Sequence, residues 1–366
     1  MNFAMLCNGK SSNRISRVEI CDAIVSEGGT FYNAGVYDGT LDACYEAERV
    51  EFLPIVASRS NTNPFKELKS IKSVKEQVKK HNIDSVLIYG IKNHPAMAIG
   101  AAKGGAKRIV CVVNGTGNLF FMKGIKAKLV KFMSKVMLRK AYKKCHKVVF
   151  QNEDDAALML KMKLVKPEQV VNTNGSGVNL DRYAKTPVPK NNSFAMISRL
   201  TRNKGTLDYI EAARIVKEKY PDAKFTLAGR IEFQKDDPGI AEIHKAHEEG
   251  IIDYIGMTNN VKGVLDECMC LVHPSYYREG VPRSVLEAMA TGRPIITCNT
   301  PGNKKTVNGK NGFLVNPKSP TELADRMIYM IEHQDDAVAM GDESRKYANE
   351  AFNIYDINKI VLGLFE

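Results

Sequence analysis

Short apolar runs alternate with helical patterns along the whole chain, and this alternation restricts the fold more than any other feature. In the first half, the runs at residues 2–9, 50–56, 85–90, 108–115, 147–152 and 169–175 indicate strands. The pattern restarts in the second half, with strands predicted at 194–200, 224–230, 252–257, 270–275 and 294–299. Strands that alternate with helices are typical of parallel sheets covered by helices. We therefore predict an α/β protein with two Rossmann-like units.

The length of the chain and one polar connector predict where these units meet. A chain of 366 residues is long enough for two domains with separate cores. The connector "DRYAKTPVPKNNS", residues 181–193, has two prolines and no periodicity, as domain linkers often do. We predict domains at 1–182 and 193–351, with a C-terminal helix at about 352–366 that packs back on the first domain. Ligands of such sheets bind beyond the carboxyl ends of the strands, so two facing domains would enclose a cleft.

The cysteines and the apolar segments predict a reduced, cytoplasmic protein. The chain has no run of eighteen apolar residues, and the apolar stretch at its start is too short for a signal peptide. Its eight cysteines form no Cys-x-x-Cys pair, and the closest two, Cys268 and Cys270, are expected to face the same side of a strand. We expect reduced core thiols, with neither disulfides nor a metal site.

The positive charge is concentrated in one segment. Lys123 to Lys147 holds ten of the Lys and Arg residues and no acid, so of the net charge of +12 only +2 belongs to the rest of the chain. Apolar residues recur there at helical spacing, at Ile125, Leu129, Phe132, Met133, Val136 and Met137. A basic amphipathic helix suits an anionic membrane surface. The alternative is a core-packed helix with a basic solvated face; nucleic acid is not expected, because no recognised binding motif accompanies the charge.

Two basic residues follow the first strand of the second half. Arg199 lies in "ISRL", and Lys204 lies in "RNKG" just before a predicted helix. Fixed cations beside a helix start favour a phosphate group, because the free N–H groups and the helix dipole also attract anions. We interpret Arg199 and Lys204 as diphosphate ligands; the alternative is two surface charges that cap nearby carbonyls.

Two glutamates eight positions apart suggest what else the ligand contains. Glu279 ends the loop after a predicted strand, and Glu287 lies within the following helix "RSVLEAMA". Each carboxylate can accept two hydroxyl hydrogen bonds, so one acid could hold a sugar and the other a ribose diol. Gly280 and Val281 could add backbone N–H groups. The pattern fits a sugar nucleotide, although a helix N-terminal charge and a surface acid would also explain the two glutamates.

A resemblance to a known family supports this interpretation. The segments "SRLTRNKG", "AGRI", "HPSYYREGVPRSVLEAMATGRPIIT" and "PGNKKTVNGKNGFLV" resemble the nucleotide-sugar half of retaining glycosyltransferases of family 4, which have the GT-B fold. The sequence looks closest to bacterial enzymes of lipid-linked polysaccharide assembly. The loops "VNGTGNLF" at 113–120 and "NGSGVNLDRY" at 174–183 also look like that subgroup.

The resemblance implies roles for particular residues. It implies that Arg199 and Lys204 bind the diphosphate, that Glu279 binds the donor sugar and that Glu287 binds the ribose. The remaining residues that it places at the substrates are Gly280, Val281, Ser284, Ile255, Met257, Asn114 and Gly115, with Ile255 and Met257 nearest the nucleobase. His94, in "IKNHPAM", follows a strand end and could assist in the cleft, although a lone histidine is more often structural.

The resemblance also implies a reaction. A hexose or N-acetylhexosamine would pass from a nucleotide-diphosphate sugar, with UDP expected, to a saccharide acceptor linked to polyprenyl diphosphate, with retention of configuration. Neither a metal nor another cofactor is implied, and the enzyme would work peripherally on the inner face of the plasma membrane.

Two other classes of protein stay open at this stage. A NAD-dependent oxidoreductase would also have Rossmann-like units, but no G-x-G-x-x-G follows the first predicted strand. A non-catalytic protein that docks on membranes and binds nucleotide sugars would explain the basic segment, but not the combination of Arg199, Lys204, Glu279 and Glu287.

Overall fold

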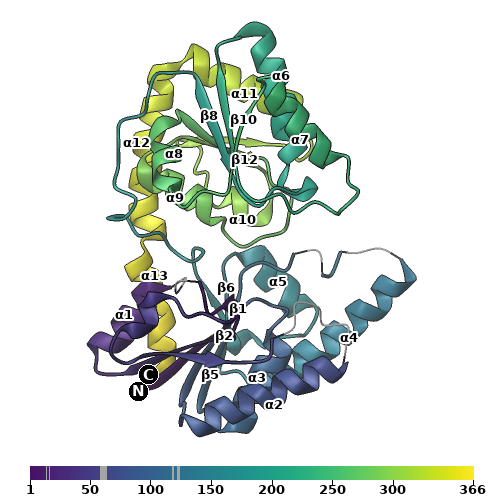
Figure 1. The fold of residues 1–366 in the computed structure, drawn as a ribbon, viewed down its shortest axis with the longest axis vertical. Helices are drawn as coiled ribbons and strands as arrows, with labels where there is room; N and C mark the ends of the chain where they lie inside the picture. The colour runs from purple at the N-terminus through teal and green to yellow at the C-terminus, as the bar shows by residue number, and fades with distance from the viewer. Residues whose placement is uncertain (14, 16, 58–63, 118, 122–123) are drawn as a thin grey trace. The chain divides into compact units, whose positions relative to one another are not determined.

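The chain forms two compact units in a computed structural model that describes residues 1–13, 15, 17–57, 64–117, 119–121 and 124–366. Unit 1 comprises Met1–Thr173 and Ile357–Glu366, and unit 2 comprises Asn174–Asp356 (Figure 1). Each unit contains one parallel sheet with helices on both faces, which confirms the predicted α/β class.

Unit 1 contains a seven-stranded sheet of order β3-β2-β1-β4-β5-β6-β7. The strands are β1 (Asn2–Lys10), β2 (Thr30–Val36), β3 (Val50–Pro54), β4 (Ser85–Tyr89), β5 (Arg108–Val113), β6 (Lys147–Phe150) and β7 (Val170–Asn172). The helices are α1 (Val18–Ser26), α2 (Pro64–Lys80), α3 (His94–Gly104), α4 (Ile125–Tyr142) and α5 (Glu153–Lys161), with 3-10 turns at Ala43–Glu46 and Pro167–Gln169.

Unit 2 contains a six-stranded sheet of order β10-β9-β8-β11-β12-β13. The strands are β8 (Ser193–Ile197), β9 (Lys224–Ala228), β10 (Asp253–Gly256), β11 (Cys270–His273), β12 (Ile295–Cys298) and β13 (Gly312–Val315). The helices are α6 (Thr206–Lys219), α7 (Gly239–Glu248), α8 (Val261–Glu267), α9 (Arg283–Thr291), α10 (Pro301–Lys304), α11 (Pro320–Glu332) and α12 (Gln334–Phe352), and a 3-10 turn covers Arg202–Lys204. Helix α13 (Ile354–Leu362) and a last 3-10 turn (Gly363–Phe365) follow.

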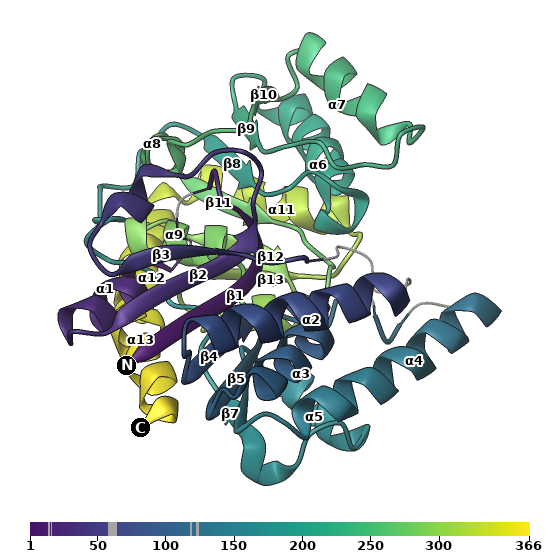
Figure 2. The same ribbon diagram turned by 60° about the horizontal axis from the view of Figure 1, so that its bottom comes forward.

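Burial on both faces explains why the strands read as continuous apolar runs. In β1, Phe3 and Met5 belong to one core cluster, while Ala4 and Leu6 belong to the cluster on the other face. Successive side chains of a strand point to opposite faces, so both faces need apolar residues. Figure 2 shows α2, α3 and α4 on one face of the unit 1 sheet, where their apolar residues share a cluster.

The border between the units lies earlier than the prolines suggested. The backbone N–H of Val178 donates to Phe352 O at 2.8 Å, and Leu180 and Tyr183 pack in a unit 2 cluster with Val285. The predicted boundary at residues 182–193 therefore lies inside unit 2, which begins at Asn174. The connector carries no helical or strand pattern, but Tyr183 is buried in the cluster that contains residues of α9 and α12, and Val188 is half-buried against the other unit 2 cluster.

The chain returns to unit 1 at its C-terminal end. Val361 and Phe365 join the core cluster of α1 and β1, and the ring of Phe365 meets that of Phe3 edge-on, with centroids 5.0 Å apart. In Figure 1 the last helix, in yellow, lies beside α1. Unit 1 is therefore built from two separate parts of the chain.

Two strands, β2 and β13, were not among those predicted. In β2, Asn33 and Gly35 interrupt the apolar run, and both have structural reasons to be there. The Asn33 amide bonds the Tyr45 hydroxyl, and a Cβ on Gly35 would lie 2.4 Å from the carbonyl oxygen of Gly9. These contacts require a polar residue and a glycine within β2, so its sequence lacks the continuous apolar run by which the other strands were predicted.

The eight cysteines are free thiols; six are buried, as expected of core residues, while Cys7 and Cys44 are half-buried. The expectation that Cys268 and Cys270 face one side of a strand is wrong, because β11 begins only at Cys270 and Cys268 lies in the preceding loop. The two residues belong to different core clusters.

No helix within the described ranges is both long enough and apolar enough to cross a membrane.

Candidate functional site

The predicted ligand residues of unit 2 lie where its strand order reverses. Strands β8 and β11 are neighbours at the centre of the sheet, and the chain proceeds outward from them in both directions. In such sheets, ligands bind beyond the carboxyl ends of the two strands at this point. The loop after β8 carries Arg199 and Lys204, and the loop after β11 carries Glu279.

A glycine allows these two loops to touch. Gly205 follows Lys204 with φ of +76°, and a Cβ at this position would lie 2.2 Å from the carbonyl oxygen of Pro274. A side chain would therefore collide with the β11 loop, and its backbone conformation would also be strained. Glycine at this position places Lys204 next to the loop that ends in Glu279.

Lys204 and Glu279 form a largely buried ion pair. The Lys204 Nζ lies 2.5 Å from Glu279 Oε2, and the two side chains are 10% and 16% exposed. The other carboxylate oxygen, Oε1, accepts hydrogen bonds from Ser275 Oγ at 2.8 Å and from His273 Nε2 at 3.1 Å. Three side chains, from the turn after β8, the last residue of β11 and the loop after β11, thus fix the position of this carboxylate.

The partners of Glu279 keep it charged. Burial alone would raise its pKa, but the Lys204 ammonium and the hydrogen bond from His273 hold the pKa well below its usual range. Burial lowers the pKa of His273, and Glu279 opposes that effect only in part. We therefore assign a neutral imidazole that donates from Nε2, with its buried Nδ1 having no hydrogen-bond partner among the described residues.

The loop after Glu279 is held by a second close approach. A Cβ on Gly302 of α10 would lie 1.3 Å from the carbonyl oxygen of Gly280, so only glycine lets α10 lie there. Asn303 donates from Nδ2 to Ser275 O at 2.8 Å. The backbone N–H groups of Gly280 and Val281 take part in no hydrogen bond among the described residues.

Comparison with known proteins gives this site a family. The glycosyl transferases group 1 family matches residues 180–347, which covers most of unit 2. The chain is a GT-B glycosyltransferase. The predicted fold class, with two Rossmann-like units, is confirmed by solved structures that share this architecture.

Two curated relatives cover most of the glycosyltransferase. One is the N,N'-diacetylbacillosaminyl-diphospho-undecaprenol alpha-1,3-N-acetylgalactosaminyltransferase of Campylobacter jejuni, 26% identical over 76% of this chain and 75% of the relative. The other is the UDP-Gal:alpha-D-GlcNAc-diphosphoundecaprenol alpha-1,3-galactosyltransferase of Escherichia coli, 26% identical over 86% of this chain and 82% of the relative.

A solved structure extends the fold similarity to both units. Anabaena HepE in complex with UDP-glucose has a TM-score of 0.77 at 18% identity, over 99% of this chain and 98% of that chain. At this level of identity the comparison concerns the fold alone.

Glu287 of the glycosyltransferase has partners of its own, separate from those of Glu279. Its carboxylate lies 3.6 Å from Arg283 Nη2, one turn earlier on α9, and bonds the Tyr183 hydroxyl. Burial raises the pKa of Glu287, which Arg283 and Tyr183 oppose, and burial with this carboxylate raises the pKa of Tyr183 to about 12. Ser284, beside Arg283, is half-buried at the start of the same helix.

The other predicted donor ligands lie at the carboxyl edge but point to solvent. Arg199 is 61% exposed and donates from Nη1 to Glu232 Oε2 at 2.9 Å. Ile255 and Met257 are exposed at the end of β10, which is the edge strand of the sheet. These three residues do not contact Lys204 or Glu279 in the hydrogen-bond and ion-pair network of the described chain.

The predicted residues of unit 1 differ in accessibility. Asn114 and Gly115 follow β5, and Asn114 is exposed while Gly115 has φ of +107°. His94 is fully buried, with Nδ1 2.9 Å from the Tyr142 hydroxyl and Nε2 3.2 Å from Val112 O. Burial lowers the pKa of His94 to about 3. Both ring nitrogens are thus engaged inside the protein, which favours the structural role over assistance in catalysis.

Sequence reasoning did not single out His273, Ser275 or Asn303. His273 and Ser275 lie in "LVHPS", at the carboxyl end of a recognised strand, so the rule that selected Arg199 could also have found them. Nothing in the sequence indicates that Asn303, from α10, bonds the Ser275 carbonyl oxygen. These three residues position Glu279 or its loop.

The basic segment forms α4, but its large apolar residues face solvent. Ile125 is 87% exposed, Phe132 66% and Leu129 61%, whereas Leu138 and Tyr142 near the end of the helix are buried in the unit 1 core. The alternative of a core-packed apolar face is therefore wrong for the first turns of α4. Lys123, at the start of the predicted basic segment, lies outside the described residues.

Proposed function

We propose that this glycosyltransferase moves a hexose or N-acetylhexosamine from a UDP-sugar to a saccharide linked to polyprenyl diphosphate. The buried Lys204–Glu279 pair at the reversal of the strand order is the observation that carries this proposal. The names of the two curated relatives describe acceptors of this kind, and the E. coli relative uses UDP-Gal. HepE, a structural neighbour, was crystallised with UDP-glucose.

The site supplies both charge types that such a donor needs. Lys204 and Arg199 bind the diphosphate and balance the charge that develops on it as it leaves. Glu279, held as a carboxylate, accepts hydrogen bonds from the sugar hydroxyls. The N–H groups of Gly280 and Val281 donate to the same sugar. When the donor binds, the Lys204 ammonium therefore contacts both the Glu279 carboxylate and a phosphate of the donor.

The other donor and acceptor contacts follow from the family resemblance. Glu287 binds the ribose diol, Ser284 the phosphate, and Ile255 and Met257 border the nucleobase. Asn114 and Gly115, exposed or partly exposed after β5, bind on the acceptor side.

The reaction retains the configuration of the transferred sugar and needs no bound metal. The acceptor hydroxyl attacks on the face from which the diphosphate departs, and its proton passes to the leaving phosphate oxygen. A new glycosidic C–O bond replaces the bond to the phosphate, and UDP is released. Arg199 and Lys204 take the electrostatic role that a divalent cation has in other transferases.

A donor and acceptor panel tests this proposal. The protein is incubated with UDP- and GDP-linked hexoses and N-acetylhexosamines together with a polyprenyl-diphosphate-linked sugar, and the product is analysed by mass spectrometry and NMR. We expect one UDP-sugar to be transferred as the α-anomer, at the same rate in EDTA. Inverted product, or activity that EDTA removes and only added metal restores, contradicts the mechanism.

We also propose that α4 docks this enzyme on the anionic inner face of the plasma membrane. Ile125, Leu129, Phe132 and Met133 lie on one stripe of the helix and are exposed; the exposed Lys128 lies beside this stripe, and the exposed Lys140 follows it toward the end of the helix. An apolar stripe between cations matches the acyl boundary and the headgroups of an anionic bilayer. Each exposed cation adds about 1 kcal/mol of attraction to such a surface.

Membrane docking agrees with the proposed acceptor. A polyprenyl-diphosphate-linked sugar is anchored in lipid, so an enzyme held at the lipid surface meets it at high local concentration. A nucleic acid would use the cations of α4 but not four exposed apolar side chains, which is why we propose lipid as the partner.

A further inference from the structure

A small polar pocket lies at the carboxyl edge of the unit 1 sheet, on the opposite unit from the donor site. It is lined by Ala57, Glu67, Ser70, Lys92, Asn93, Ala96 and Met97. Ala57 follows β3, Lys92 and Asn93 follow β4, and Glu67 and Ser70 come from α2. Ligands of parallel α/β sheets bind at this edge.

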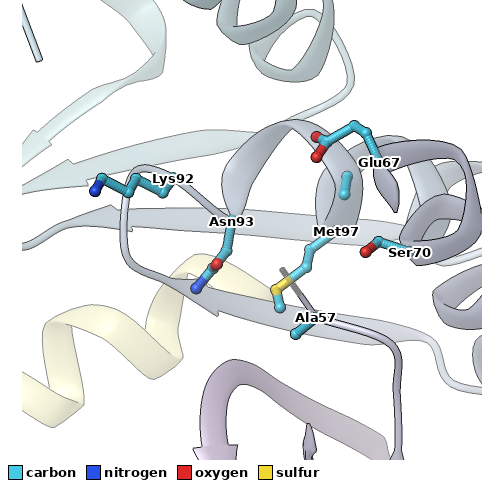
Figure 3. A pocket seen from close by; sticks show the side chains of 7 residues that line it. Ala57, Glu67, Ser70, Lys92, Asn93 and Met97 are labelled. Carbon is cyan, nitrogen blue, oxygen red and sulfur yellow. The ribbon is translucent and has the colours of Figure 1, made fainter. Parts of the chain in front are cut away.

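The walls of the pocket are held by two closely packed helices. A Cβ on Gly100 of α3 would lie 2.8 Å from both Ile71 O and Val74 Cβ of α2, and Gly104 has a similar contact with Val78. Such close packing fixes α2 relative to α3. Figure 3 shows Glu67 and Ser70 of α2 on one side of the pocket and Met97 of α3 on the other, with Asn93 in the loop that precedes α3.

Two polar atoms in this pocket are buried and have no hydrogen-bond partner among the described residues. They are Glu67 Oε1 and Ser70 Oγ, and Ser70 is only 3% exposed. The Ala96 N–H donates to the Glu67 carboxylate, and Asn93 Nδ2 donates to Tyr89 O at 3.0 Å. Both of these nearby donors are therefore already engaged. Buried polar atoms are rarely left without a partner, which indicates that a polar group from a ligand or solvent belongs here.

The chemistry and the size of the pocket define that group. An alcohol O–H can donate to Glu67 Oε1 and at the same time accept from the Ser70 hydroxyl. A phosphate is disfavoured, because the carboxylate would repel it. The enclosed space admits a group about as large as a water molecule. A single hydroxyl fits, whereas a whole sugar ring does not.

We infer that this pocket binds one hydroxyl group of the saccharide acceptor, between Glu67 and Ser70. The inference rests on the proposed function, because it requires a saccharide acceptor on unit 1. The sugar ring lies outside the pocket, and one hydroxyl reaches inward. The pocket therefore selects acceptors that carry a hydroxyl at that position, and it plays no part in binding the donor.

Ser70→Ala and Glu67→Gln test this inference in the full-length enzyme. We expect each variant to raise the KM for the acceptor about tenfold, since each removes or alters one hydrogen bond to the bound hydroxyl. The KM for the donor and the slow hydrolysis of the UDP-sugar should stay unchanged. Lys69→Gln, an exposed position on the same helix, is the matched control and should leave every constant unchanged.

Acceptor analogues that each lack one hydroxyl identify the hydroxyl that enters the pocket. The comparison is a double-mutant cycle between the enzyme and the acceptor. With the wild-type enzyme, one deoxy position should cost about tenfold in kcat/KM, and the same analogue should cost Ser70→Ala almost nothing more. Thermal melting of each variant checks that it is folded, and serine to alanine removes only one atom from the core.

Three results would overturn the inference. Folded variants with a wild-type acceptor KM would show that the pocket holds only water, and a fall in kcat without a change in KM would show a purely structural role. A wild-type enzyme that binds UDP-sugars but transfers to no saccharide would overturn the proposed function and this inference together. Failure of the inference alone leaves wild-type transfer intact, so the two failures can be told apart.

Discussion

At the scale of single residues, the central feature is a charge pair that the protein buries. Lys204 and Glu279 lose most of their hydration, and such a loss is compensated only when the geometry is good and the remaining oxygens are bonded. His273 and Ser275 supply those bonds to Glu279. The pair therefore places a fixed cation and a fixed anion at the end of β8 and β11 before any donor arrives.

Removal of either member of this pair should abolish most transfer. We expect Glu279→Ala and Lys204→Ala to lower kcat/KM by roughly thirty- to thousandfold, since a lost charged contact to the donor costs ~2 to 4 kcal/mol. Steady-state kinetics with the preferred UDP-sugar measures the effect. Lys219 and Glu332 form a pair of equal length, 2.5 Å, on the surface, and Lys219→Ala serves as the control. Near-normal turnover by a folded Glu279→Ala enzyme contradicts the assignment.

The same pair predicts how stability depends on pH. The folded pKa of Glu279 is lowered, so its contribution is complete above the unfolded pKa of about 4 and is lost as the pH falls further. Lys204→Met leaves a buried carboxylate without a cation, and we expect a loss of about 3 kcal/mol at neutral pH. Protonation relieves this penalty, so the gap to wild type should narrow toward pH 4. Urea unfolding at several pH values measures the gap, and a gap that stays constant would refute the argument.

At the scale of elements, α4 combines two surfaces. Leu138, Ala141 and Tyr142 pack in the unit 1 core, while Ile125 and Leu129 lie on the opposite side of the helix and face solvent. Large exposed apolar patches on a soluble surface mark sites of interaction. Because this segment has no acids, the proposed docking would also gain an electrostatic attraction to anionic lipid.

Changes on the outward side of α4 should separate membrane binding from catalysis. We expect Leu129→Ser with Phe132→Ser, or reversal of Lys128, Lys140 and Lys143 to Glu, to release the enzyme from anionic vesicles in a sedimentation assay. Transfer to a polyprenyl-linked acceptor should slow, and hydrolysis of the UDP-sugar should not change. High salt should weaken vesicle binding, because exposed charges are screened beyond about a Debye length.

Reversal of Lys235, Lys310 and Lys346, exposed in unit 2, makes the same change in net charge and is the matched control. Equal loss of vesicle binding in both charge variants would indicate a general charge effect instead of a docking helix. A wild-type enzyme that ignores anionic vesicles at low salt would refute docking outright.

At the scale of the whole molecule, the two units differ in whether one continuous part of the chain forms them. Unit 2 is continuous, whereas unit 1 needs Ile357–Glu366 to complete its core. Phe365 is buried against Phe3, and Arg108 Nη2 donates to Glu366 O at 2.8 Å. Contacts of the last ten residues should therefore stabilise unit 1 and not unit 2, which holds the proposed donor site.

Phe365→Ala tests this linkage. We expect it to destabilise unit 1 by about 3 kcal/mol, as is usual for a buried phenylalanine. Hydrogen exchange should rise in peptides of β1 and β5, while β8 and β11 keep their protection and UDP still raises the melting temperature of unit 2. Tyr355→Ala, an exposed aromatic on α13, is the control. Equal loss of protection in both sheets would contradict independent units.

The sequence by itself predicted the class of fold and the neighbourhood of the site. Strands buried on both faces must be apolar throughout, so they are visible as runs without any structure. Because loops at the carboxyl ends of parallel strands meet, Lys204 and Glu279 could be placed near one another from strand positions alone. The same rule could not show that His273 and Ser275 would position Glu279, since those contacts depend on how the loop after β11 folds back on the end of the strand.

Tertiary structure alone decided which way surfaces point and where the units divide. Helical periodicity shows that Ile125, Leu129 and Phe132 share one side of α4, but it does not show whether that side meets the core or the solvent. Only the position of the neighbouring helices and sheet settles this. The border at Asn174 and the missed strand β2 have the same cause, because both depend on contacts between residues that are far apart in the sequence.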